Sequence, residues 1–134
     1  MLMNAEKKSS ARIVQAIRTA FPEDALGVDE ILHRIGYGED AYHAWIEMFS
    51  QQTSDAIRRQ DFCKATDHLQ LVASLLDPGD EEIIRCIDVS YVESLMWDIK
   101  DEKLLRAGWK IIPKKLKDLY VAMWGERPFM KDVK

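Results

Sequence analysis

Carboxylate and histidine side chains are the groups in this chain that could carry out acid–base chemistry, but their spacing does not favour it. Asp88 and Glu93 lie five residues apart. In an α-helix this is a rotation of about 500°, which directs the two side chains to different faces. Asp67 and His68 are neighbours, and neighbouring helical residues do not face each other. We therefore predict that the protein is not an enzyme and has no catalytic residue. An enzymatic function would need acids and histidines that the sequence pattern does not bring together.

The histidines and cysteines also lack the spacing of a metal site. His33, His43 and His68 lie ten and then twenty-five residues apart, and no Cys-x-x-Cys or His-x-x-x-His pair is present. Cys63 and Cys86 each fall beside an apolar helical position, so we expect two buried free thiols and no disulfide. Glycine-rich phosphate loops are absent from the sequence as well. The prediction is that the protein holds neither a metal nor another cofactor.

Composition favours one ordinary globular domain. The chain has 134 residues, of which 47% are hydrophobic and 31% charged, within the usual range for a domain with a single core. No run approaches the roughly 18 apolar residues that span a bilayer. The first residues turn polar too soon for a secretory signal. We expect a single cytoplasmic domain over residues 1–134, with residues 1–9 frayed.

Apolar residues that recur three and four positions apart predict the secondary structure. Between residues 62 and 76 these are Phe62, Ala65, Leu69, Val72 and Leu76. Similar patterns, bounded by helix-start and helix-stop residues, predict helices over 10–21, 29–35, 40–57, 62–76, 80–96 and 113–124. Ser10, Asp29 and Asp80 are the expected N-caps of three of these helices. A short alternation at residues 87–92 resembles a strand, but the four-residue spacing continues on both sides of it, so we interpret it as helix.

Short connections between consecutive helices place them antiparallel. The predicted fold class is therefore all-α: a compact stack of about six antiparallel helices, as an irregular bundle or a small α-solenoid-like array. No fixed-period repeat is visible in the sequence. We expect Leu69, Ile87, Tyr91 and Leu119 to be buried. Trp45 and Trp124 fall in apolar stripes and should also pack in the core. For Trp97 and Trp109, which flank an expected loop, the sequence does not decide between core packing and a stacking platform.

Charge is distributed unevenly along the second half of the chain. Residues 77–102 contain nine acidic side chains against Arg85 and Lys100, whereas residues 103–117 contain six basic side chains and no acid. Two solvated faces would explain this pattern as well as a binding site would. The basic run could contact nucleic acid, but the net charge of −4 argues against it. The acidic run is the better candidate for a partner surface.

Helix order suggests where such a surface would lie. In a stack of antiparallel helices, every second connection emerges on the same side. A continuous third helix would then bring the turn at 36–40 and the turn at 77–82 to one edge. Carboxylates gathered there would attract a basic partner. The predicted partner-binding residues are Tyr37, Glu39, Asp40, Asp77, Asp80, Glu81 and Glu82.

Two segments of the C-terminal half carry a family resemblance. They are Leu-Val-Ala-Ser-Leu-Leu-Asp-Pro-Gly-Asp-Glu-Glu-Ile at 71–83 and Val-Ser-Tyr-Val-Glu-Ser-Leu at 89–95, followed by a last helix that ends at Gly125. With residues 69–125 as its main extent, the chain resembles small all-helical bacterial immunity-type proteins of contact-dependent inhibition and polymorphic toxin loci. The resemblance implies an all-helical fold and a role in neutralising a toxin, and it implies no particular binding residue.

The leading hypothesis is therefore an immunity protein, an antitoxin that binds a cognate secreted or contact-delivered toxin through an acidic surface. The expected partner is a basic nuclease or ribonuclease domain, with no direct contact to nucleic acid or membrane, and we expect a monomer. The alternative is an intracellular helical adaptor or regulatory domain that binds another protein with the same surface.

Overall fold

The structure is a computed structural model that describes residues 2–38 and 40–131, with side chains described from residue 7 onward. The described residues contain no β-strand, so the all-α prediction is confirmed. In chain order the elements are α1 (Leu2–Ala20), α2 (Pro22–Arg34), α3 (Tyr42–Arg58), α4 (Phe62–Leu75), α5 (Glu81–Cys86), η1 (Ile87–Val92), α6 (Glu102–Ile111), α7 (Lys114–Trp124) and η2 (Pro128–Met130).

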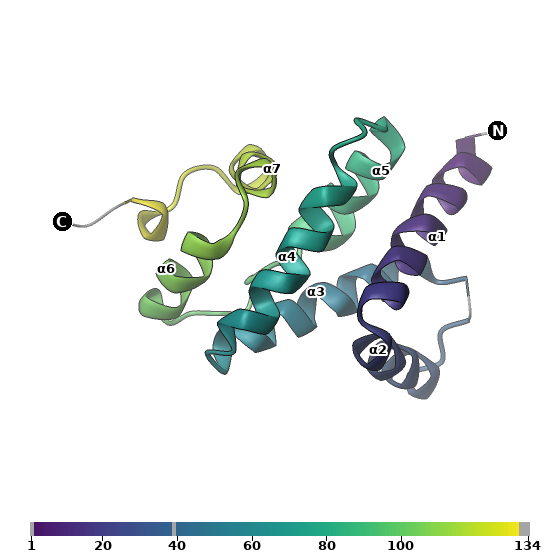
Figure 1. The fold of residues 1–134 in the computed structure, drawn as a ribbon, viewed down its shortest axis with the longest axis horizontal. Helices are drawn as coiled ribbons and strands as arrows, with labels where there is room; N and C mark the ends of the chain where they lie inside the picture. The colour runs from purple at the N-terminus through teal and green to yellow at the C-terminus, as the bar shows by residue number, and fades with distance from the viewer. Residues whose placement is uncertain (1, 39, 132–134) are drawn as a thin grey trace.

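Helix α3 is the element around which the others are arranged. It packs against α1, α2, α4, α6 and η1. In Figure 1, α1 and α2 lie at the right, α6, α7 and η2 lie at the left, and α3 and α4 lie between them. Phe49 and Ile57 of α3 are completely buried. The core thus runs along α3 and connects the two ends of the molecule.

Three of the four predicted core residues are confirmed. Leu69, Ile87 and Tyr91 are fully buried, whereas Leu119 is only partly buried. On α7 the fully buried residue is instead Leu116, one turn earlier. Leu119 was therefore the wrong choice of buried residue on α7, because Leu116 and Leu119 both fit a helical period and only the packing decides which points inward.

Helix-capping aspartates set several helix starts, as the sequence indicates for Asp80. The Asp80 carboxylate accepts hydrogen bonds from the backbone N–H groups of Glu82 and Ile83, at 2.9 and 3.3 Å. Asp61 caps α4 and Asp101 caps α6 in the same way. Each such cap satisfies backbone donors that the first turn leaves unpaired and contributes about 1 kcal/mol.

The expected start of the first helix was wrong. Residues 1–9 were predicted to be frayed with Ser10 as the cap, but α1 begins at Leu2. Ser9 is buried, and the Ser10 hydroxyl lies 3.2 Å from the sulfur of Cys86. The reason is tertiary: α1 packs against α5, which stabilises a helical segment that its own polar sequence does not favour.

The second helix also begins earlier than predicted. Asp29 was expected to cap it, but α2 begins at Pro22, a residue suited to the first helical position. Asp29 therefore lies inside α2 and binds Arg18, at 2.7 Å, and the Trp45 indole N–H, at 2.8 Å. A single residue, Phe21, separates α1 from α2.

The chain between residues 86 and 112 departs most from the prediction. The expected regular helix over 80–96 changes at Ile87 into a π-helical turn, η1, and then into turns that include Met96 at φ 58°. Helix α6 was missed altogether, and Trp109 is buried within it instead of flanking a loop. Asp101 as a cap and Leu104, Leu105 and Trp109 at helical spacing were the available signals.

Two further outcomes concern the tryptophans and cysteines. Trp45 is buried and Trp124 partly buried, as expected, and Trp97 is 68% exposed. Cys63 and Cys86 are both free, but only Cys86 is buried, so the prediction for Cys63 was wrong. Along the described part of the chain, no helix has the length and apolar character needed to cross a membrane.

Candidate functional site

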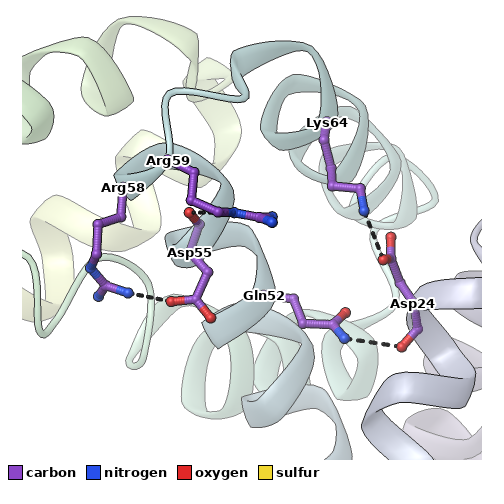
Figure 2. Close-up of a pocket in the computed structure, with 6 residues that line it drawn as sticks. All are labelled: Asp24, Gln52, Asp55, Arg58, Arg59 and Lys64. Carbon is purple, nitrogen blue, oxygen red and sulfur yellow. Dashed lines mark hydrogen bonds and ion pairs between the residues drawn. The ribbon is translucent and has the colours of Figure 1, made fainter.

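A polar pocket opens between α2, α3 and α4, with a volume of about 360 Å³. Asp24 comes from the first turn of α2, Lys64 from the first turn of α4, and the remaining side chains from the C-terminal half of α3 and the residue that follows it. The lining residues, shown in Figure 2, are Asp24, Gln52, Asp55, Arg58, Arg59 and Lys64. The pocket thus collects three cationic and two anionic side chains from three helices.

Hydrogen bonds fix most of the pocket wall. The Lys64 ammonium lies 3.0 Å from one Asp24 carboxylate oxygen, and the Gln52 amide nitrogen donates to the Asp24 backbone carbonyl at 3.1 Å (Figure 2). Arg58 is paired with Asp55 and, at 2.8 Å, with Asp98. These contacts hold α2 and α4 against α3 at the pocket.

Behind the pocket, hydrogen bonds continue into the core as one chain. The second Asp24 carboxylate oxygen lies 2.9 Å from His68 Nε2. His68 Nδ1 lies 2.9 Å from the Thr53 hydroxyl, which lies 2.8 Å from the Tyr91 hydroxyl. Thr53, His68 and Tyr91 are fully buried, and Phe49 packs on the imidazole ring with a centroid distance of 4.3 Å.

Burial and the neighbouring charges set the protonation states in this chain. Burial lowers the pKa of His68, although hydrogen bonding to Asp24 opposes the shift, so the imidazole is neutral at pH 7. Burial acts to raise the pKa of Asp24, but hydrogen bonds to His68 and Lys64 outweigh it, and the pKa is lowered. Burial raises the pKa of Tyr91. We assign Nε2–H of His68 as donor to Asp24, which leaves Nδ1 to accept from Thr53.

The order carboxylate, imidazole, hydroxyl is also that of a catalytic triad. Here the hydroxyl belongs to Thr53, which is fully buried, so it does not meet a substrate in this conformation. The arrangement instead satisfies every buried polar group that it contains. The sequence reasoning considered His68 only beside Asp67 and missed both Asp24 and Thr53, which lie 44 and 15 residues away in the chain.

The rotation around the helix axis from Asp88 to Glu93 differs from the one expected for an α-helix. In the π-helical turn the backbone N–H of Glu93 donates to the Asp88 carbonyl at 3.1 Å, so the two residues are one turn apart. Burial, and then the Glu93 charge, raise the pKa of Asp88. The rotation of about 500° therefore does not apply here, since a π turn closes over five residues.

The structure places the predicted acidic residues in two separate regions. Figure 1 shows the α4–α5 turn at the top of the molecule and the α2–α3 loop beside the middle of α1. Asp77 pairs with Lys115 of α7, Asp80 caps α5, and Glu82 lies 3.6 Å from Arg85. Glu81 is exposed in the first turn of α5. Their carboxylates are thus partly occupied by contacts within the protein.

The remaining predicted site residues belong to the α2–α3 loop. Tyr37 is 51% exposed, and the Asp40 carboxylate lies 3.6 Å from the Lys7 ammonium. Glu39 lies outside the described residues. Tyr37 borders two hollows, of about 580 and 380 Å³, which also share Tyr42. Ile35, next to this loop, is 57% exposed. We call this region the loop surface, made up of Glu30, His33, Ile35, Tyr37, Asp40 and Tyr42.

Comparison with known proteins relates most of the chain to a described family. A family model described as "Domain of unknown function (DUF7674)" matches residues 14–125, which include the pocket, the buried hydrogen-bond chain and the loop surface. No curated protein and no solved structure matches the chain.

Proposed function

Because the chain belongs to the DUF7674 family, whose description assigns no activity, we propose its function from its surfaces: it is a non-catalytic, cytoplasmic protein-binding domain. In its most specific form, the proposal is an immunity protein that binds and neutralises a toxin, with a basic nuclease domain as the partner. The resemblance of residues 69–125 to immunity-type proteins supports this form.

The observation that carries the proposal is the pair of exposed apolar side chains at the loop surface. Ile35 and Tyr37 lie on either side of Gly36, whose φ of 93° favours glycine and turns the chain sharply. Both are more than half exposed, and Tyr37 lines a hollow to which Tyr42 and Trp45 also contribute. Exposed tyrosines next to concave apolar surface are frequent anchors of protein interfaces.

Charge supports a basic partner. Residues 1–99, which contain the loop surface, carry 18 acidic and nine basic side chains, a net charge of −9. Such an excess attracts a cationic protein and raises its association rate, most strongly at low ionic strength. The acidic turn at Asp77–Glu82 contributes to this field, although Lys115 and Arg85 reduce its effect.

The alternative is a helical adaptor that uses the loop surface for a different intracellular protein. Both forms need the same exposed residues, so they differ only in the identity of the partner. Co-expression with a toxin-like domain, where one is encoded beside the gene, separates them, because only an immunity protein restores growth of the host cell.

The loop surface is tested by an Ile35→Ala/Tyr37→Ala double variant in that growth assay, with the dissociation constant measured on the purified pair. We expect binding to weaken by at least tenfold, as for loss of an interface anchor. Leu26→Ala is the matched control, because Leu26 is 60% exposed on α2 and lies outside the loop surface. Unchanged protection by the double variant would exclude this surface.

The acidic turn is tested by amides at Asp77, Asp80, Glu81 and Glu82. The expected result is a slower association rate with little change in the dissociation rate. Amides at the exposed residues Glu23 and Asp67 serve as the control; Asp24 is unsuitable because it binds His68 and Lys64. Equal slowing per neutralised carboxylate in the two sets would show that only net charge matters, and no binding to any such toxin domain would refute the immunity role.

A further inference from the structure

We propose that the pocket between α2, α3 and α4 binds a small ligand in which a carboxylate stands next to an amide N–H. This arrangement occurs in N-acylated amino acids and at the C-terminal end of peptides. The site is separate from the loop surface and does not depend on the proposed function. The site combines three features: the Arg59 guanidinium, the Gln52 amide oxygen as a hydrogen-bond acceptor, and the Asp24 carboxylate, which Lys64 and His68 hold in place.

Arg59 supplies the guanidinium. Its Nε donates to the Asp55 backbone carbonyl at 3.3 Å, and its terminal nitrogens have no hydrogen-bond partner in the part of the chain that the structure describes. Figure 2 shows this guanidinium extending from the end of α3 toward the space between Lys64 and Gln52. Arg58 is different, since Asp55 and Asp98 occupy its guanidinium. Arg59 is thus the arginine that is able to hold a carboxylate through two parallel N–H bonds.

Gln52 supplies the acceptor. Its amide oxygen is buried and has no hydrogen-bond partner among the residues that the structure describes, although Gln52 lines the pocket. The amide nitrogen donates to the Asp24 carbonyl, so exchanging the two atoms would place oxygen against oxygen. A buried acceptor without a donor is costly. A ligand N–H would satisfy it once the long Arg59 or Lys64 side chain shifts to admit the ligand.

The charges of the pocket match one negative charge. Arg58 is paired with Asp55 and Asp98, and Lys64 with Asp24, so among the described residues Arg59 is the lining cation whose charge no ion pair offsets. Asp24 is fixed by Lys64 and, from behind, by His68. The wall is therefore held in place, and a carboxylate beside Arg59 and Lys64 would complete the charge balance.

Three probes of similar size test separately whether the ligand needs the carboxylate and the amide N–H. N-acetylglycine carries both the carboxylate and the N–H, N-acetylsarcosine lacks the N–H, and N-acetylglycinamide lacks the carboxylate. In ¹H–¹⁵N NMR titrations of the whole chain, we expect saturable shifts at the start of α2, the end of α3 and the start of α4 with N-acetylglycine. The other two probes should bind at least threefold more weakly. Equal binding of N-acetylglycinamide, or shifts that do not saturate, would overturn the proposal.

Variants connect the binding to the named side chains. Arg59→Gln should weaken N-acetylglycine binding at least fivefold, while the control Arg34→Gln, at the end of α2, should leave it unchanged. Gln52→Leu should remove the preference for N-acetylglycine over N-acetylsarcosine. Circular dichroism confirms that each variant is folded. Equal effects of Arg59→Gln and Arg34→Gln would refute the site.

A longer probe identifies the source of the ligand. Tighter binding of N-acetyl-Gly-Gly-Gly than of N-acetylglycine supports a peptide C-terminus, since the extra residues then contact the pocket rim. Equal affinity supports a free N-acylated amino acid. Both results support recognition of a carboxylate beside an amide N–H, and failure of all N-acyl probes would refute it whatever happens at the loop surface.

Discussion

Residues 1–99 pack around a core that includes hydrogen-bonded polar side chains, whereas residues 100–131 pack around three aromatic rings. In the first region, Thr53 connects His68 to Tyr91. In the second, the Trp109, Tyr120 and Phe129 rings meet edge to face, with centroids 5.6 to 6.3 Å apart. The first arrangement requires particular partners at particular atoms, while the second requires mainly shape and area.

The two regions also differ in charge. Residues 1–99 have a net charge of −9, and residues 100–134, with ten basic and five acidic side chains, have a net charge of +5. Asp77 and Lys115 form an ion pair between them. Opposite charge therefore favours their association, while the acidic excess of the larger region leaves it free to attract a basic protein.

The largest expected effect tests the apolar core of residues 1–99. Leu69→Ala removes a fully buried side chain of α4 and should lower the free energy of unfolding by about 2–5 kcal/mol. Urea denaturation followed by circular dichroism measures the change. Leu26→Ala, on an exposed position, should change it by less than about 0.5 kcal/mol. If Leu69→Ala lowers the free energy of unfolding by no more than Leu26→Ala does, this core tolerates a cavity.

The next prediction concerns the junction of the two regions, at Gly108 of α6. A Cβ added there would lie 2.7 Å from the Met96 sulfur and 3.2 Å from two Ile57 carbons. Gly108→Ala should therefore destabilise the protein by about 1–3 kcal/mol, despite the higher helix propensity of alanine.

Gly27→Ala is the control for that substitution. Its Cβ would meet only the Gln52 amide nitrogen, at 3.2 Å, so the change should be neutral or stabilise α2 by up to about 1 kcal/mol. Thermal unfolding of both variants measures the difference in stability. A Gly108→Ala variant as stable as the parent would mean that α6 is not closely docked on α3.

An effect of about the same size separates the polar core from the aromatic one. Thr53→Val removes the hydroxyl that His68 and Tyr91 share, which leaves both without that partner, and should cost about 1–3 kcal/mol. Tyr120→Phe removes a hydroxyl from the aromatic cluster and should cost less than about 1 kcal/mol, because the ring packing is retained. Similar losses in urea denaturation would contradict the distinction between the two cores.

The smallest effect is the pH dependence that His68 contributes. Its folded-state pKa is below the unfolded value of 6.5, so its contribution to stability is complete above about pH 6.5 and is lost as pH falls toward the folded-state pKa. The slope is at most about 1.4 kcal/mol per pH unit. Urea denaturation at pH 7.5, 6.5 and 5.5 measures it. His68→Gln should reduce the slope; an unchanged slope in this variant would refute the assignment.

Part of this fold was predictable because its signals are local. The apolar spacing from Phe62 to Leu76 predicted α4, and Asp80 was correctly assigned as a cap, since both depend on residues within one or two turns. The charge asymmetry is likewise a property of the sequence alone. Residues 87–96 were predicted less well, because the π turn depends on packing against α3.

The candidate sites depended on contacts that no local pattern contains. Asp24 meets His68 across 44 residues, and His43 meets Ser90 across 47, at 2.7 Å. The predicted acidic residues separated into two regions because the directions of helices and turns follow from how their faces pack. The sequence by itself determined most of the helices, much of the core and the sign of each region's charge, since these follow from short-range periodicity and composition. Only the tertiary structure decided which polar side chains meet, because that depends on how the apolar faces of distant helices come together.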